Sequence, residues 1–595
     1  MILKALYDYY ERSKDLAPEG MEYKEIAYLI VIDEEGNFIR LENCFIDNKR
    51  CSTFLVPKSV SRSSNPVANI AWDNPSYVLN FSEANLPMKN PPTDLVKLKQ
   101  EEGKRLKDIE KNTKNSSVFR EKIRDLYHAL PENRTIRAIS LFYDKYQDRP
   151  TDVIKDDVLW EDLCKHLTKN ISFKINGETT IAPENGELNA WLRRTSSDNE
   201  DEGNKQLCLV TGECGPIAET TKATPIMGSQ ATAKLVSFQV SSGYDSYGKT
   251  KGFNAPISKE AEFKYTTALN HLLDKNSRNL YRIGTRSYVF WASSRSEASV
   301  EMEENFFSFL NPNFENEDNP DKHVEHIEKV FKAVFSGVLK TTDQDRFYIL
   351  GLAPNAARIA VVYWKEIPIR DFASNLLRHF DDMEIIDDRK EKKPYKGIYS
   401  ILQAIALQGK VSDVQPNLPE STIKSILQGT LYPYSLYMAC LRRIRAEQQT
   451  FVTRTAILKA YLNRKSNHKK LTVMLDKSNN NIGYLCGRLF ATLEYLQKRS
   501  SGIDTIRQRY MNAASTTPAT VFSNLMNLSV HHEDKLDKGG LIFFQNTKDE
   551  IIQLMPASGF PAHLDIEDQG RFFIGYHHQR AEFYKPKENK ESNAE

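Results

Sequence analysis

Apolar runs in the first two thirds of the chain predict strands mixed with helices. Residues 25–33 and 38–46 are two apolar, β-prone stretches around the turn EEGN, an arrangement that predicts a β-hairpin. Aromatic and β-branched residues predict further strands at residues 287–293 and 346–366, where APNAA suggests a hairpin or crossover turn. Residues 89–124 predict a highly charged helix with a solvated surface.

Beyond residue 398 the apolar positions recur with helical spacing. Two stripes repeat every four residues: Leu436, Cys440 and Ile444, followed by Leu485, Leu489 and Leu493. Side chains at this spacing share one face of an amphipathic helix. Short breaks rich in Pro, Ser and Gly separate these segments, so a helical bundle is expected. The predicted fold class is therefore α+β, with a mixed α/β body over residues 1–397 and a C-terminal helical bundle over 398–595.

Length and charge set bounds on the function. At 595 residues the chain exceeds what one hydrophobic core organises, so two or more domains are expected. Lys and Arg total 81 against 79 Asp and Glu, so nucleic-acid binding has to rest on local patches. No apolar run reaches the ~18 residues of a membrane span. The absence of a signal peptide and the seven scattered cysteines predict a cytoplasmic protein.

Signatures of enzymes and metal sites are weak. Cys208 and Cys214 have no matching pair of ligands, so no zinc site is predicted. The sequence lacks the GxSxG, HExxH and GxGxxG motifs. The doublets His531–His532 and His577–His578 place neighbouring side chains in different directions on a helix, which favours surface or interface positions over catalysis. We therefore predict no catalytic residue, no metal and no cofactor.

Residues 441–470 hold a clear local excess of positive charge. Nine basic residues stand against the single acid Glu447: Arg442, Arg443, Arg445, Arg454, Lys459, Arg464, Lys465, Lys469 and Lys470. On two helices they are expected to form a basic face that follows a phosphate backbone, with binding that weakens steeply as salt rises. A solvated surface whose acidic partners lie elsewhere in the sequence is the alternative.

Two polar segments are candidates for ligand contact. In residues 54–81, Lys58 and Arg62 are suited to phosphates, while the asparagines can both donate to and accept from base edges. In residues 224–258, small residues permit close backbone approach, and Ser, Gln and Lys side chains supply hydrogen bonds. A polar loop followed by a strand explains the second segment equally well.

Several stretches, in order from the first residue to near the last, resemble one known family. They are MILKALYDYYER at the start, FLVPKSVSRSSNPVANIAWDNPSYVL at 54–79, CLVTGECGPIA at 208–218, FYILGLAPNAARIAVVYW at 347–364 and GRFFIGYHHQR at 570–580. With them the chain resembles the large subunit of the type I-C CRISPR Cascade, the Csd family. The charged stretches 89–114 and 311–326 resemble it least.

The resemblance implies a non-catalytic subunit of a crRNA-guided antiviral complex. Such a subunit recognises the protospacer-adjacent motif (PAM) on duplex DNA, aids R-loop formation, contacts the displaced strand and recruits a helicase–nuclease. Its implied protein partners are the crRNA-bound backbone subunits, the subunit that binds the crRNA end, and a small subunit from the same gene. A nuclease with dispersed carboxylates and an assembly scaffold without base contacts are the alternatives.

On this sequence the resemblance implies two sets of contacts. The motif-reading residues are Asn69, Asn74, Ser229 and Gln230. The phosphate-binding residues are Lys58, Arg62 and Lys249, to which the basic segment adds Arg442, Arg443, Arg445, Arg454, Arg464 and Lys465. Trp72 is expected to pack the loop, and Asp73 to be a turn or cap residue, because a carboxylate near phosphates is disfavoured.

Type I-C systems encode a small subunit from an internal start within the large-subunit gene. On that basis Met474 is the expected start, because it precedes the amphipathic helix predicted over residues 482–496 and leaves residues 474–595, enough for a compact bundle. A start at Met511 would discard the first helix of that bundle. An ordinary buried methionine is the alternative.

Overall fold

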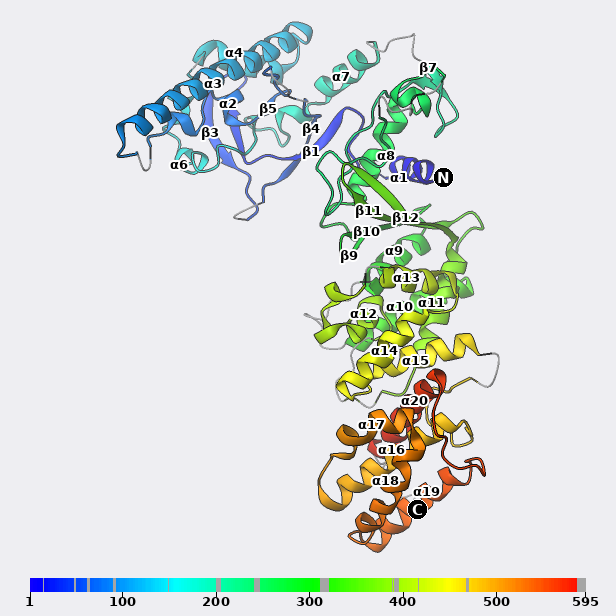
Figure 1. Ribbon diagram of the computed structural model, residues 1–595. Coiled ribbons are helices and arrows are strands. Elements are labelled where there is room, and N and C mark those ends of the chain that lie inside the picture. Colours follow the sequence, from blue (N-terminus) through cyan, green and yellow to red (C-terminus); the bar gives the residue numbers. More distant parts are fainter. Residues whose placement is uncertain are drawn as a thin grey trace, which may run out of the picture. The chain divides into compact units, whose positions relative to one another are not determined.

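The computed structural model describes residues 1–13, 15–47, 50–60, 62, 65–88, 92–147, 149–198, 205–239, 245, 247–310, 320–387, 389, 395–415, 417–466 and 470–585 (Figure 1). They divide into two compact units. Unit 1 comprises Met1–Arg12, Thr221–Ser237 and Ala268–Glu595, and unit 2 comprises Ser13–Thr220 and Phe238–Thr267. Residues 1–397 therefore contribute to both units.

Unit 2 is built on a four-stranded sheet with the strand order β3-β2-β6-β5. The strands are β2 (Tyr28–Ile32), β3 (Phe38–Asn43), β5 (Trp72–Asp73) and β6 (Ile171–Ile175). β2 and β3 form the predicted antiparallel hairpin, and β2 pairs in parallel with β6. All five residues of β2 are buried, because strands flank it on both sides and α4 packs on the sheet, which explains its continuous apolar sequence YLIVI.

Helices cover this sheet. α4 (Arg134–Tyr146) packs against β2 and β6, and α3 (Leu95–Ala129) packs against α4 and α2 (Pro75–Val78). The other elements of unit 2 are β1 (Met21–Glu25), β4 (Thr53–Pro57), η1 (Glu83–Asn85), α5 (Thr151–Ile154), α6 (Trp160–Leu163), η2 (Ala182–Glu184), α7 (Gly186–Asp198), β7 (Lys205–Leu207), β8 (Cys214–Pro216) and η4 (Lys251–Asn254). β1 pairs with β4, and β7 with β8. The predicted charged helix is thus present as α3.

Unit 1 begins with a second sheet, in the order β12-β11-β10-β9, in which all neighbours are antiparallel. Its strands are β9 (Leu280–Ile283), β10 (Arg286–Ala292), β11 (Arg346–Asn355) and β12 (Arg358–Pro368). β11 and β12 form a hairpin across the APNAA segment, and β10 matches the strand predicted from SYVFWAS. α1 (Ile2–Arg12) belongs to this unit, and α8 (Lys259–Leu272) continues into it from unit 2.

Helices make up the remainder of unit 1. They are α9 (Glu297–Leu310), α10 (Pro320–Ser336), α11 (Ile369–Met383), α12 (Ile398–Ile405), η5 (Leu407–Gly409), η6 (Val411–Asp413), α13 (Asn417–Gln428), α14 (Tyr434–Glu447), α15 (Val452–Lys465), α16 (Ile482–Ser501), α17 (Ile506–Thr516), α18 (Pro518–Glu533), α19 (Lys538–Ile552) and α20 (Ile566–Tyr584). The predicted apolar stripes lie on α14 and α16, and their six residues are buried. No helix in the described ranges is both long enough and apolar enough to cross a membrane.

The C-terminal helices α16–α20 pack together around α16, which contacts each of the other four. α16 and α20 approach closely at Gly487 and Gly575, where an added Cβ would collide with backbone of the facing helix. α20 also packs against α15, so one continuous apolar core links the bundle to the preceding helices. The α+β class predicted from the sequence, with sheets toward the N-terminus and packed helices toward the C-terminus, is confirmed.

Candidate nucleic-acid interface

The loop between β4 and β5 in unit 2 holds its arginine against an acid and an aromatic ring. Asp73 is buried, and its carboxylate accepts from the backbone N–H groups of Asn69 at 3.1 Å and Asn74 at 2.9 Å. Arg62 forms an ion pair with Asp73 and lies 4.1 Å from the centre of the Tyr77 ring. Burial raises the pKa of Asp73, whereas the hydrogen bonds and the charge of Arg62 oppose that rise.

The amide oxygens of both asparagines are occupied within this loop. Asn69 is buried, and its Oδ1 accepts from the backbone N–H of Val60 at 3.0 Å. Asn74 caps α2, because its Oδ1 accepts from the backbone N–H of Ser76 at 3.0 Å and from the Ser76 hydroxyl at 2.7 Å. Nδ2 of Asn74 donates to Asp73 over a longer 3.3 Å. Any contact of these side chains with a base would therefore use their NH2 groups.

Trp72 packs inside unit 2, as expected from the sequence. Its side chain is 2% exposed, and its Nε1 donates to the carbonyl of Pro57 at 3.1 Å. Lys58 follows directly in the chain, where its backbone N–H donates to Gly20 at 2.8 Å and its side chain is exposed. Lys249, also in unit 2, is exposed as well. The loop backbone is thus anchored while both lysines face solvent.

The second candidate loop belongs to unit 1 and presents one exposed amide. The hydroxyl of Ser229 closes a tight turn, since it accepts from the N–H of Ile226 at 3.0 Å and donates to the carbonyl of the same residue at 2.8 Å. Gly228 within that turn has φ of +81°, a conformation that disfavours any side chain. The backbone N–H of Gln230 donates to Ala356 at 3.3 Å. The Gln230 side chain is exposed and has no hydrogen-bond partner among the described residues.

Three basic residues of the segment 441–470 are buried among the helices of unit 1. Arg454 pairs with Glu447 at 2.6 Å and Arg464 with Asp382 at 2.5 Å, and the two arginine side chains are 4% and 1% exposed. Nζ of Lys459 donates to the carbonyl of Asp382 at 3.0 Å, and burial lowers the pKa of this amine. These side chains hold helices together, so contact with a phosphate would require their pairs to break.

Two further members of the segment form ion pairs, and a third is partly buried. Arg443 shares Glu447 at 2.6 Å, and Lys465 pairs with Glu567 at 2.6 Å. Burial lowers the pKa of Arg445, whose Nε is buried with no hydrogen-bond partner in the described part of the chain. The carboxylates that meet Arg464 and Lys465 lie 82 and 102 residues away in the sequence, so the local excess of charge is balanced from a distance.

Two members of the segment remain open to solvent. Arg442 and Lys470 are exposed, and neither forms an ion pair with a described residue. Lys469 lies outside the described residues. The continuous basic face expected from the sequence is therefore reduced to separate exposed positions.

The chain was compared with curated proteins and with known protein families. No curated protein matches it. The family described as CRISPR-associated protein (Cas_Csd1) matches residues 6–584, nearly the whole length. The chain belongs to the Csd1 family. This assignment to the large subunit of the type I-C Cascade confirms the resemblance found in the sequence.

The Csd1 chain uses the His577–His578 doublet in helix packing. Nδ1 of His578 lies 2.9 Å from the Tyr484 hydroxyl, and burial lowers the pKa of this imidazole to about 3. Nε2 of His577 lies 2.8 Å from the carbonyl of Ile386. In the described ranges, no group of three or more His, Cys, Asp or Glu side chains is placed to hold a metal ion.

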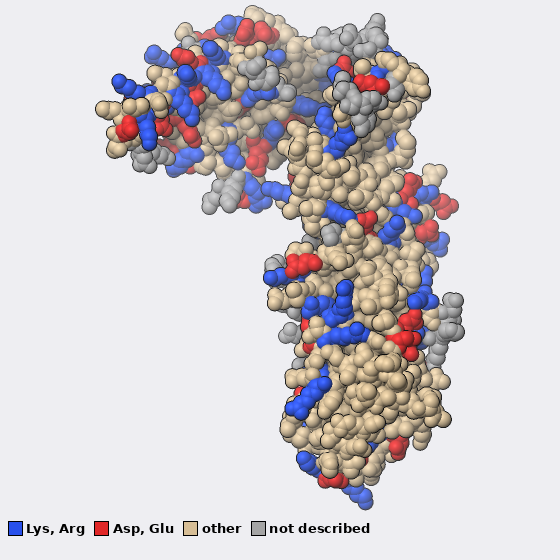
Figure 2. All heavy atoms as spheres, viewed as in Figure 1, with Lys and Arg blue, Asp and Glu red and all other residues tan. Residues whose placement is uncertain are grey.

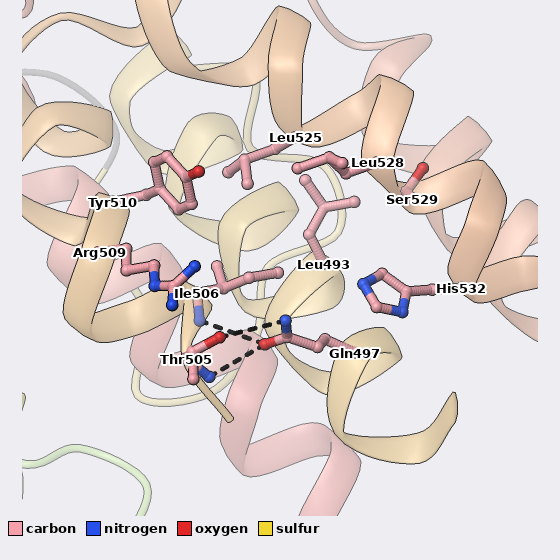
Figure 3. A pocket seen from close by; sticks show the side chains of 10 residues that line it. All are labelled: Leu493, Gln497, Thr505, Ile506, Arg509, Tyr510, Leu525, Leu528, Ser529 and His532. Carbon is pink, nitrogen blue, oxygen red and sulfur yellow. Dashed lines mark hydrogen bonds between the residues drawn. The ribbon is translucent and has the colours of Figure 1, made fainter. Parts of the chain in front are cut away.

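A small cavity lies among α16, α17 and α18 of the Csd1 chain (Figure 3). Its volume of about 70 Å³ is far below the ~300–1,000 Å³ of typical ligand sites. Gln497 on its wall accepts from the backbone N–H groups of Thr505 at 3.0 Å and Ile506 at 3.2 Å, which fixes the start of α17. His532, from the doublet His531–His532, also lines the cavity, with its Nδ1 3.0 Å from the Ser500 hydroxyl. A space of this size has room for a few waters and none for a base.

Sequence reasoning missed one participant in the β4–β5 loop. Tyr77 lies under Arg62, although the two residues are fifteen positions apart and no spacing rule connects them. The sequence did contain one indication of this contact, because an arginine, an aspartate and a tyrosine occur within one short polar segment. An arginine held in this way is oriented before any ligand arrives.

Proposed function

We propose that this chain is the non-catalytic large subunit of a crRNA-guided antiviral complex in the cytoplasm, and that it recognises the PAM on duplex DNA. The match to the Csd1 family over residues 6–584 carries the proposal. In this role the guide RNA selects the long target by base pairing, while the protein selects the short motif. The subunit then aids R-loop formation, contacts the displaced strand and recruits the helicase–nuclease. None of these tasks requires it to cut DNA.

Gln230 is the first candidate for base contact. Its amide is exposed, has no partner among the described residues, and extends from a turn fixed by Ser229. A free glutamine amide can both donate and accept, as a bidentate contact with adenine requires. Asn69 and Asn74 come second, because their oxygens are already hydrogen-bonded. Their NH2 groups would select acceptors on a base edge, such as guanine O6 or N7.

The phosphate contacts can be ranked by the same criterion. The exposed lysines Lys58 and Lys249 and the exposed Arg442 come first. Arg62 comes next, because its guanidinium is partly exposed but already meets Asp73. Last come the residues whose hydrogen bonds or burial must change before they can reach DNA: Arg443, Arg445, Arg454, Arg464 and Lys465.

The test is binding of target duplexes by the assembled guide complex, with the correct motif and with a mismatched one. Gln230→Ala is expected to weaken binding of the correct motif by about 1–3 kcal/mol and to leave the mismatched target unchanged. Gln553→Ala, which removes another exposed glutamine of unit 1, is the matched control and is expected to behave as wild type. Asn74→Ser keeps a capping oxygen on α2 but removes the NH2 group, so it separates base contact from helix stability.

The alternatives give different results in the same assay. A complex that binds every motif equally would identify the subunit as an assembly scaffold. Metal-dependent cleavage of DNA by the isolated chain would identify a nuclease. Equal losses on both motifs for Gln230→Ala would remove Gln230 from the reading set and leave the family role untouched.

The internal start is proposed at Met474. This residue lies between α15 and α16 and is 55% exposed, so it is not a core methionine, and an ordinary surface methionine is the alternative to a start site. The helices that follow it, α16–α20, make their own contacts around α16. The intact mass of a small polypeptide that copurifies with the complex should correspond to residues 474–595. A mass that begins at Met511 or elsewhere would contradict this start.

A further inference from the structure

The N-terminal half of α3 is fixed to unit 2 along one side only. Asp94 caps the helix, since its Oδ1 accepts from the backbone N–H of Val96 at 2.8 Å. Arg105 donates to the carbonyls of Ala84, at 2.9 Å, and Leu86. Asn112 donates to Ser82 at 2.7 Å and to Asn85 at 3.1 Å. Both anchoring side chains reach the same short segment around η1, so the opposite side of α3 faces solvent.

That free side carries a set of lysines, which we call the lysine row: Lys97, Lys104, Lys107, Lys111 and Lys114. At about 100° per residue the five fall within an arc of roughly 100°. The four carboxylates of the same half, Glu101, Glu102, Asp108 and Glu110, fall outside that arc. All five lysines are exposed, and none pairs with a carboxylate of the described residues. Over the part of unit 2 where Figure 1 places α3, Figure 2 shows basic and acidic side chains side by side at the surface.

We infer that the lysine row binds the phosphate backbone of the duplex that flanks the motif. The inference rests on the proposed function, because it supplies a second contact with the DNA that the motif-reading loops hold. From its first to its last member the row spans about 25 Å, since an α-helix rises about 1.5 Å per residue. That length matches about seven base pairs of duplex, which presents one negative charge per ~1.7 Å of axis.

The composition of the row favours duplex DNA over single-stranded nucleic acid. Sites for single strands add aromatic side chains on which bases stack. No aromatic residue occurs between Lys97 and Lys114. A straight row of charge without stacking groups suits a stiff duplex, whose backbone keeps its phosphates at fixed positions.

The same composition disfavours a protein partner. The buried centres of protein–protein interfaces are enriched in aromatic residues, Met and Arg, and are depleted in Lys. The row consists of lysines with Gln100 among them, and the exposed leucines of this half, Leu95 and Leu106, lie outside its arc. Lysines act as hydrated point charges that meet phosphates without a required geometry. The contact is therefore expected to be independent of sequence.

The row and the β4–β5 loop belong to the same compact unit. Nδ2 of Asn115, one residue beyond the row, donates to the hydroxyl of Ser76 at 3.2 Å. Ser76 lies in α2, whose cap is Asn74. A hydrogen-bonded path of a few residues thus connects the row to a candidate reading residue, so a duplex held by one is held in fixed register with the other.

The experiment compares two triple variants in the assembled guide complex. Lys104→Gln/Lys107→Gln/Lys111→Gln removes three charges from the row and keeps good helix formers in α3. The control, Lys99→Gln/Lys155→Gln/Lys165→Gln, removes three exposed lysines of unit 2 that lie off the row. Targets share one protospacer and one motif, and carry a flanking duplex of either about 5 or about 30 base pairs. Affinity is measured from about 50 to about 200 mM salt, the range in which phosphate contacts dominate.

The row variant is expected to lose affinity only for the long flank. Because each phosphate contact contributes about 0.9 to the slope of log K against log salt, that slope should become shallower by about 2 to 3. From about 50 to about 200 mM salt, the affinity of wild type should therefore fall roughly 16- to 64-fold more than that of the row variant. The control variant should bind every target as wild type does. The row variant should bind the short-flank target and a single-stranded target as wild type does, and its preference for the correct motif should not change.

Three results would overturn the inference. The row variant could match the control on the long flank, lose as much affinity for single-stranded as for duplex targets, or fail to assemble while the control assembles, which would identify a protein partner. Failure of the proposed function is recorded separately. It would show as a wild-type complex with no preference between motifs, whatever the length of the flank.

Discussion

In two charged segments of this chain, the exposure of the basic residues is the opposite of what the sequence indicates. The segment 441–470 has nine basic residues and one acid, yet Arg454, Lys459 and Arg464 are buried and engaged. The helix α3 mixes both signs of charge, yet its lysine row is exposed and unpaired within the described residues. Local charge excess is therefore a poor guide to which cations face solvent.

The difference has a simple physical origin. A buried arginine needs a carboxylate, and the fold can supply one from any distance in the sequence, as Asp382 does for Arg464. On an exposed helix, ion pairs between neighbouring side chains contribute little to stability. Opposite charges can therefore be close in sequence without forming an ion pair. The pattern around the helix axis then decides what a ligand meets.

The largest expected effect tests the buried side of this comparison. Arg464→Met should destabilise unit 1 by about 3–5 kcal/mol, because it leaves the Asp382 carboxylate without its partner. Thermal unfolding of the full chain, followed by the midpoint of the helical transition, measures the effect. Lys470→Met, an exposed neighbour, is the control and should not move the midpoint. The double variant Arg464→Met/Asp382→Leu should recover much of the loss, and a double variant as unstable as the single one would argue against the pair.

A smaller effect is expected on the stability of the protein at acidic pH. Burial alone would raise the pKa of Glu447, but hydrogen bonds and charge from Arg454 and Arg443 prevail and hold it below the ordinary 4.5. A carboxylate with a depressed folded pKa adds stability above its unfolded pKa, and this stability is lost as pH falls through the folded pKa. Below about pH 4.5, the midpoint temperature of unfolding should therefore decrease more steeply with falling pH for wild type than for Glu447→Gln. Parallel curves for the two proteins would show that the pairs contribute nothing.

The smallest effect completes the contrast. The triple substitution Lys104→Gln/Lys107→Gln/Lys111→Gln should change the stability of unit 2 by no more than about 0.5 kcal/mol, because exposed and unpaired side chains add little to folding. Chemical denaturation of the full chain checks this. A large loss would mean that the lysines support α3, and the row would then resemble the buried arginines.

Much of the fold could be predicted from local pattern. The β2–β3 hairpin, the β11–β12 hairpin and the stripes on α14 and α16 all follow from periodicity over a few residues. The pairing of β2 with β6 could not, because these strands are separated by more than a hundred residues and no local signal links them. The division into two units was equally hidden, since each unit is assembled from separate stretches of the chain.

The candidate site divides in the same way. The residue types in the β4–β5 loop pointed to nucleic acid, but their local partners could not be seen in the sequence. Asn74 is a helix cap as well as a candidate reader, and Asn69 accepts from Val60. Gln230 and Asn69 were ranked together from sequence, and only the fold distinguishes an exposed amide from a buried one.

The contacts that hold Arg62 have a consequence for the phosphate contact that we propose for it. A free arginine loses up to about 2 kcal/mol of rotamer entropy when it is immobilised against a ligand. Here Tyr77 stacks on the guanidinium, and Asp73 and the carbonyl of Val67 fix two of its nitrogens. Folding has already removed that freedom. In the proposed function, a phosphate that meets this side chain would therefore find a preset geometry, and binding would order the guanidinium little further.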